Sequence, residues 1–172
     1  MIIRNKLDSM YQLKKLGLNC FPEEIFNPKD KNMLENVSQF FSQNDANLYV
    51  VRDISKWQGN TYFNVSKEET LKNILSYNDN FSIAVSSKNY GEYTLIGDIY
   101  ISDTLDKLWL LASDNPNYNT RGVLKNPKWN YSTDYYDRKK KYVPHIDKII
   151  DYIFVRNLCN VIVECAVYPQ RV

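Results

Sequence analysis

The sequence predicts an α+β fold in which helices pack against a mainly antiparallel sheet. Three observations lead to this class. Apolar residues recur at helical spacing in four segments. Short segments rich in β-formers lie between turn signals. Most of these expected strands follow one another without a helix between them. The 172 residues, 44% hydrophobic and 24% charged, are enough for a real core. We therefore expect a single globular domain over residues 1–172.

Two helices are expected near the N-terminus. The first spans residues 5–16, and Gly17 follows it as a C-terminal stop signal. The second opens at Pro28 and runs to about Ser42. Its apolar residues are spaced as on one helix face: Met33, Leu34, Val37, Phe40 and Phe41.

A hairpin and a third helix are expected next. Residues 48–51 and 61–65 are rich in β-formers, and Gly59-Asn60 provides a turn signal between them. Ser66, with Glu69 three residues later, has the spacing of a capping box, which marks the start of a helix.

Three strands, a helix and a last strand complete the prediction. The strands span residues 81–86, 94–101 and 107–113, and the fourth helix begins at Pro144. The closing strand covers residues 160–168.

Residues 114–143 show no clean periodicity and are expected to form a long irregular loop, which in a compact domain is often functional. The loop mixes basic and aromatic side chains, a combination that suits a protein or single-stranded nucleic-acid partner. A solvated basic face would show the same composition. The candidate partner-binding residues are Arg121, Trp129, Tyr135, Arg138 and Lys140.

Composition limits the function classes. Only five glycines are present, so no glycine-rich phosphate loop is available, and a net charge of +2 does not by itself indicate nucleic-acid binding. Cys20, Cys159 and Cys165 lack metal-type spacing and are interpreted as reduced thiols of a cytoplasmic protein. No apolar run is long enough to span a membrane, so a membrane partner is not expected.

Glu164 is the strongest candidate for chemistry. It lies in the otherwise apolar closing strand, where a buried carboxylate would need a cation, a metal or a proton. We expect it to point inward. Asp98, inside another apolar strand, could join Glu164 in holding a divalent cation, which prefers carboxylate oxygens. Alternatively, Asp98 faces solvent at a β-bulge.

Three further residues are candidates for binding a nucleotide. Arg52 stands at a strand end, where a guanidinium can fork onto phosphate, although it could equally pair with Asp53 or another surface acid. Lys56 and Trp57 lie in the expected hairpin turn, where a cation beside a ring suits a phosphate and a base. An exposed lysine lying over an aromatic ring would look the same.

Four segments, in order along the chain, resemble the ATP-grasp domain of phosphoenolpyruvate synthases and pyruvate phosphate dikinases. They are Leu16-Gly-Leu-Asn-Cys-Phe-Pro22, Val50-Val-Arg52, Gly59-Asn-Thr-Tyr-Phe-Asn-Val65 and Val161-Ile-Val-Glu-Cys-Ala166. The resemblance implies an ATP-binding cleft with Arg52 on phosphate and Glu164 on magnesium. The sequence departs from the family pattern in two ways. Asp53 and Ile54 stand where the family has two serines, and the glycine-rich stretch of the family is absent.

Two functions follow as hypotheses. The first is a small ATP-grasp-like nucleotide-binding protein using ATP and Mg²⁺, with phosphoryl-transfer activity left open. The alternative is a non-enzymatic binding protein that inhibits a host nucleoprotein or defence complex. Abundant Asn, Lys, Ile and Tyr indicate an AT-rich coding genome, that of a low-GC bacterium or its mobile elements, and this alternative is a protein encoded by a phage or another mobile element.

Overall fold

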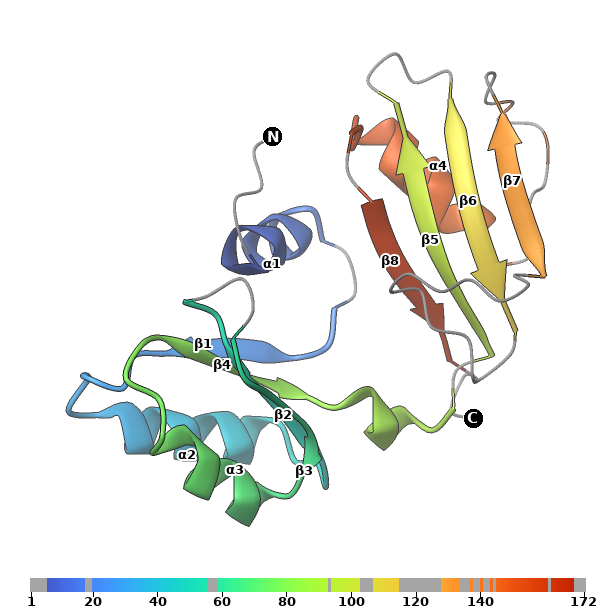
Figure 1. Cartoon of the computed structure of the whole chain (residues 1–172). Helices are drawn as coiled ribbons and strands as arrows, with labels where there is room; N and C mark the ends of the chain where they lie inside the picture. Colours follow the sequence, from blue (N-terminus) through green and yellow to red (C-terminus); the bar gives the residue numbers. More distant parts are fainter. Residues whose placement is uncertain are drawn as a thin grey trace. The chain divides into compact units, whose positions relative to one another are not determined.

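The computed structural model divides into two compact units, Met1–Asn89 and Tyr90–Val172, each described by itself below (Figure 1). Both combine helices with an antiparallel sheet, which confirms the α+β prediction. Whether the chain folds as one domain stays a prediction. The structure describes residues 6–17, 20–55, 59–92, 94–102, 107–114, 128–133, 137, 140, 143, 145–160 and 162–168.

The order of the elements extends the predicted one. In chain order they are α1 (Lys6–Lys15), β1 (Glu23–Phe26), α2 (Met33–Gln43), β2 (Tyr49–Asp53), β3 (Thr61–Val65), α3 (Lys67–Ile74), β4 (Phe81–Val85), the 3₁₀ helix η1 (Ser87–Tyr90), β5 (Leu95–Ile101), β6 (Leu108–Ser113), β7 (Trp129–Thr133), α4 (Asp147–Val155) and β8 (Ile162–Val167).

Unit 1 is built on sheet A, whose strand order is β1-β4-β2-β3 with every neighbouring pair antiparallel. The predicted hairpin forms as β2 and β3. Helices α2 and α3 lie along one face of the sheet (Figure 1). Phe26 and Phe81 stack there with ring centroids 5.7 Å apart, and Phe40 meets Phe26 edge-on. This aromatic core forms because each strand turns alternate apolar residues toward the helices.

The predicted capping box at the start of α3 is confirmed. The Ser66 hydroxyl accepts from the Glu69 backbone N–H, and the Glu69 carboxylate accepts from the Ser66 backbone N–H. These bonds lower the pKa of Glu69, with the backbone N–H of Ser66 as the main cause. They satisfy backbone donors that the first helical turn leaves without partners.

Replacing Ser66 by alanine is expected to lower the free energy of unfolding by about 1 kcal/mol, because the cap acceptor is lost. Urea denaturation measures the change. Ser66→Asp, which keeps an acceptor at the cap, should remain close to the original protein. Equal stability of Ser66→Ala and Ser66→Asp would contradict this role.

Three parts of unit 1 and unit 2 differ from the sequence prediction. Residues 23–26, expected as a connection, form the edge strand β1. Helix α2 begins at Met33 rather than at Pro28, because residues 28–32 form turns in which the Asp30 side chain accepts from the Asn32 backbone N–H. The stretch expected to be irregular contains β7, which pairs with β6.

Unit 2 is built on sheet B, whose strand order is β7-β6-β5-β8, again antiparallel throughout. Helix α4 lies behind this sheet (Figure 1). Ile146, at its N-cap, and Ile150 and Ile153 within it are buried. One face of sheet B therefore packs on α4. No helix in the described part of the chain is long and apolar enough to cross a membrane.

The C-terminus of α4 ends in a Schellman motif. The backbone N–H of Leu158 bonds to Ile153 O, and that of Asn157 bonds to Phe154 O. Asn157 takes the left-handed conformation, with φ of 57°, that the motif requires, and Leu158 is buried behind it.

Replacing Asn157 by glycine is expected to stabilise the protein by about 0.5–1 kcal/mol, because glycine adopts positive φ without steric cost. Thermal unfolding measures the gain. Asn157→Ala serves as the matched control and should destabilise, since its Cβ opposes this conformation. A glycine variant less stable than the alanine variant would contradict the assignment.

Candidate functional site

Strand pairing in sheet B brings the two predicted metal ligands together. Asp98 on β5 and Glu164 on β8 are direct partners in the antiparallel register. Residues opposite each other in such a pair place their Cβ atoms roughly 5 Å apart on the same face. Gly97 and Ile99, the neighbours of Asp98, turn to the other face, where α4 packs. We call the face that carries Asp98 and Glu164 the acid face of sheet B.

Asp98 is the buried member of the pair. Only 4% of it is exposed, and its Oδ1 atom is buried without a hydrogen-bond partner. Burial raises the pKa of Asp98 to about 6, and the charge of Glu164 adds to this rise. Among the described residues, Asp98 has no partner that would neutralise a buried carboxylate. A cation placed beside it would supply that partner.

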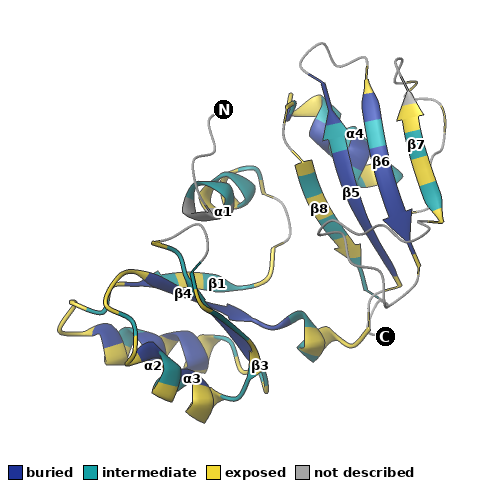
Figure 2. Cartoon of the chain, viewed as in Figure 1, coloured by how far each residue is buried: buried dark blue, intermediate teal, exposed yellow. Residues whose placement is uncertain are grey.

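The expectation that Glu164 points inward is wrong. Glu164 is exposed, as are Ile162 and Ala166 on either side of it in the alternating pattern of β8. Figure 2 shows this alternation along β8, in contrast to β5 and β6, which are buried except at Tyr100 and Trp109. The reason is that β8 is an outer strand of sheet B, so its apolar sequence does not require burial on both faces.

The alternative that placed Asp98 at a solvent-facing bulge is also wrong. The register of β5 against β6 and β8 runs without a shift from Ile96 to Tyr100. Asp98 therefore lies in regular strand, in the middle of a sheet, where its burial follows from strands on both sides. The buried acid that the sequence predicted for β8 is found on β5.

On the opposite face of sheet B, the residues next to Asp98 and Glu164 pack toward α4. A Cβ atom on Gly97 would lie 2.9 Å from Ile146 Cδ1, the end of a flexible side chain, and 3.0 Å from Leu111 O, so the close approach of α4 favours glycine here. Cys165, opposite Gly97, donates its S–H to Gly97 O at 3.4 Å. Burial, followed by the charge of Asp98, raises the pKa of the Cys165 thiol to about 12, which keeps it protonated. Cys20, Cys159 and Cys165 form no disulfides.

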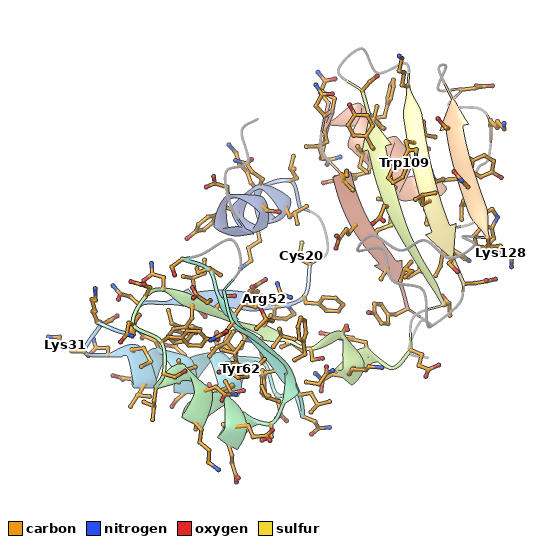
Figure 3. All side chains as sticks on the ribbon, viewed as in Figure 1. Cys20, Lys31, Arg52, Tyr62, Trp109 and Lys128 are labelled. Atoms are coloured by element: carbon orange, nitrogen blue, oxygen red, sulfur yellow. The ribbon has the colours of Figure 1, made fainter. Side chains whose placement is uncertain are left out.

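Two aromatic residues flank the acid pair and were not predicted as site residues. Tyr100 and Trp109 are register partners on β5 and β6, two residues along from Asp98, and lie on the acid face. Both are half-buried, and Figure 3 labels Trp109 on sheet B. The signal that could have found Tyr100 is its offset of two from Asp98, which places both side chains on one face.

Arg52 lies in unit 1 on β2, with an acidic partner. Its Nη1 atom is 3.6 Å from Glu23 Oε1, and the same oxygen accepts from the Ser82 hydroxyl at 2.6 Å. The sequence analysis left open that Arg52 pairs with Asp53 or with another surface acid. The structure shows the second case, with Glu23 as the acid. About 30% of the Arg52 side chain remains exposed. Figure 3 labels this residue. Its role on phosphate stays a prediction.

The remaining candidates are only partly described. Lys56, Trp57, Arg121, Tyr135 and Arg138 lie outside the described residues. Trp129 opens β7 and carries the Lys128 ammonium 4.6 Å from its ring centroid, while Lys128 also pairs with Asp114. Lys140 lies 5.8 Å from the centroid of the Tyr131 ring. A cation over an aromatic ring is compatible both with a partner-binding surface and with a solvated basic face. Partner binding by this segment therefore stays a prediction.

A metal site at the acid pair stays a prediction. Among the described residues, no group of three or more His, Cys, Asp or Glu side chains could hold a metal ion. A pair of carboxylates is too few for a metal cage made by the protein alone. It is sufficient for Mg²⁺ that arrives with phosphate oxygens and water, because Mg²⁺ is commonly bound through one or two carboxylates.

Known structures share this fold. No family model and no curated protein matches the sequence. The D-alanine-D-alanine ligase from Coxiella burnetii matches with a TM-score of 0.54 over 95% of this chain, at 11% identity. The D-alanyl-alanine synthetase A from Vibrio cholerae matches with a TM-score of 0.50 over 93%, at 9% identity. The chain spans less than half of either protein, 43% and 49%. Both are ATP-grasp ligases, and the likeness supports an ATP-grasp fold for this chain.

Proposed function

We propose that this protein binds a Mg²⁺-nucleotide, ATP first among the candidates, with Asp98 and Glu164 as the protein ligands of the metal. The single observation that carries the proposal is the buried Oδ1 of Asp98, which has no hydrogen-bond partner and lies opposite a second carboxylate. The ATP-grasp fold supports the choice of a nucleotide. The more specific resemblance to the phosphoenolpyruvate synthase type stays a prediction.

The two carboxylates fit this metal chemically. Their oxygens are the hard ligands that Mg²⁺ prefers, and a bound cation would favour the ionised form of Asp98, whose pKa is otherwise raised by burial and by Glu164. When bound, Mg²⁺ would neutralise phosphate oxygens of the nucleotide. Glu164, being exposed, would meet the ion first, and Asp98 would hold it against the sheet.

Calorimetric titration with ATP tests this proposal. We expect binding in the presence of Mg²⁺ and much weaker binding when EDTA removes the metal. Asp98→Asn and Glu164→Gln should each weaken Mg²⁺-ATP binding by about tenfold or more, because each removes a charged ligand. Circular dichroism confirms that the variants are folded.

A matched control uses an acid away from the pair. Glu68 is exposed in the first turn of α3, in unit 1, so Glu68→Gln should leave binding unchanged. Absence of binding at millimolar Mg²⁺-ATP to the folded protein would refute the proposal. Binding that all three variants retain would place the nucleotide elsewhere.

A further inference from the structure

The edge of sheet A formed by β1 borders a hollow of about 380 Å³. Residues 22–25, which include the start of β1, line it along one side. Helix α1 contributes Tyr11 and Lys14, and the end of α2 contributes Phe40 and Asn44. All of these residues belong to unit 1. The hollow is thus a strand edge bordered by residues of two helices.

The backbone of β1 turns hydrogen-bonding groups into this hollow. Pro22 O accepts from the Val85 N–H, so the backbone of Pro22 faces β4. In an antiparallel pair the residues that face the partner alternate, so Glu24 and Phe26 also face β4. Glu23 and Ile25 therefore turn their N–H and C=O groups to the outer edge. The Lys14 ammonium donates to Glu23 O at 2.7 Å, as this direction requires.

Charges of both signs lie beside this edge, the Lys14 ammonium and the carboxylates of Glu23 and Glu24, and among the described residues Glu24 is the carboxylate without an ion pair. The Glu23 carboxylate is already engaged by Arg52 and by the Ser82 hydroxyl. Glu24, the next residue, is exposed and lines the hollow. Ile25 is half-buried and offers apolar surface on the opposite side of the strand. A segment that pairs with β1 would place a side chain opposite each of these residues in turn.

We propose that this hollow binds an extended peptide segment of a partner protein, which pairs with β1 as an added strand. The segment carries a basic side chain opposite Glu24 and apolar side chains opposite Glu23 and Ile25. Main-chain hydrogen bonds to Ile25 provide affinity, and the alternating pattern provides specificity. The Lys14 ammonium leaves Glu23 O when the peptide takes this acceptor.

A designed peptide tests this proposal. The probe is a fluorescein-labelled peptide of sequence Thr-Val-Lys-Val-Thr with blocked ends, and its anisotropy is followed as the full chain is added. Ile25→Pro removes the outward N–H without touching the bonds to β4, and proline is tolerated at such edge positions. It should weaken binding by about tenfold or more, since one bond is lost and the ring obstructs the edge. Ile25→Val, the matched control, should bind as the original protein does.

Lys14→Met provides a change in the opposite direction. Removing the ammonium frees Glu23 O, so the peptide should bind more tightly by a few-fold. A peptide with glutamate in place of its lysine should bind more weakly than the probe, because it meets Glu24 with like charge. Equal binding of the two peptides would overturn the proposed charge preference.

Two outcomes overturn the proposal as a whole. One is that the folded protein does not bind the probe at millimolar concentration, or that Ile25→Pro binds it as well as Ile25→Val. The other is a dimer, seen by analytical ultracentrifugation, that Ile25→Pro dissolves, since a second copy would then occupy the edge. Should Ile25→Pro fail to fold, amide exchange in the original protein decides. The Ile25 N–H must become protected when the peptide is added, and unchanged exchange contradicts strand addition.

Discussion

Replacing Asp98 by asparagine is expected to stabilise the metal-free protein at pH 7 by about 1–3 kcal/mol, an unusual gain for a polar substitution in a sheet. Burial, with the charge of Glu164 as a second cause, raises the pKa of Asp98 from 3.8 to about 6. At pH 7 the Asp98 carboxylate of the folded protein is therefore ionised, although the fold stabilises its protonated form more. Asparagine removes this charge and keeps nearly the same shape.

The gain should depend on pH in one direction. Because the pKa of Asp98 is higher in the folded than in the unfolded chain, protonation of Asp98 favours folding. This contribution is fully present below about pH 4 and is lost as the pH rises through about 6. Asp98→Asn should therefore match the original protein near pH 4 and exceed it above pH 6.

Urea denaturation between pH 4 and pH 8 measures this profile. Glu164→Gln is the matched control, since it removes only the neighbouring charge and leaves Asp98 buried. Its gain should be smaller than that of Asp98→Asn. An Asp98→Asn variant that is less stable than the original protein at pH 7 would contradict the account of Asp98 as an uncompensated carboxylate.

Replacing Asn89 by alanine is expected to lower the free energy of unfolding by about 2–4 kcal/mol, because its side chain makes four hydrogen bonds to backbone groups of described residues. Asn89 lies in η1, just after β4. Its Oδ1 accepts from the backbone N–H groups of Asn47 and Leu48, and its Nδ2 donates to Leu48 O and Ser86 O. The side chain thereby joins the start of β2 to the end of β4, about forty residues apart in sequence.

The variant Asn89→Asp separates the contribution of the accepting Oδ1 from that of the donating Nδ2. Aspartate keeps the acceptor for Asn47 and Leu48 but cannot donate to the two carbonyls, so it should recover only part of the stability. Urea denaturation of both variants gives the comparison. A loss below about 0.5 kcal/mol for Asn89→Ala, within the range of ordinary surface substitutions, would contradict this role.

The sequence predicted elements best where the signal is local. Ser66 and Glu69 mark the start of α3 through bonds that join residues three apart, and both bonds form. The apolar spacing of α2 likewise places Val37, Phe40 and Phe41 in the core. Residues 23–26 have no such signal, because a four-residue strand is defined by its pairing with β4 and not by its own pattern.

The candidate site was predicted in its residues but not in their burial. Asp98 and Glu164 were chosen as acids within apolar strands, and the structure makes them direct partners. Which of the two is buried depends on the order of strands in sheet B, where β5 is central and β8 is outer. Strand order is a property of long-range pairing, which the composition of one strand does not encode. The assignment of Glu164 to the interior failed for this reason.

The most direct test of the acid pair as a cation site is a crystal structure of the protein grown with Mn²⁺ and ATP, with the metal located by its anomalous scattering. Manganese accepts the same oxygen ligands as magnesium. Our account predicts an anomalous peak within roughly 2.0–2.5 Å of carboxylate oxygens of both Asp98 and Glu164. A well-ordered nucleotide whose metal lies away from these two side chains would contradict it.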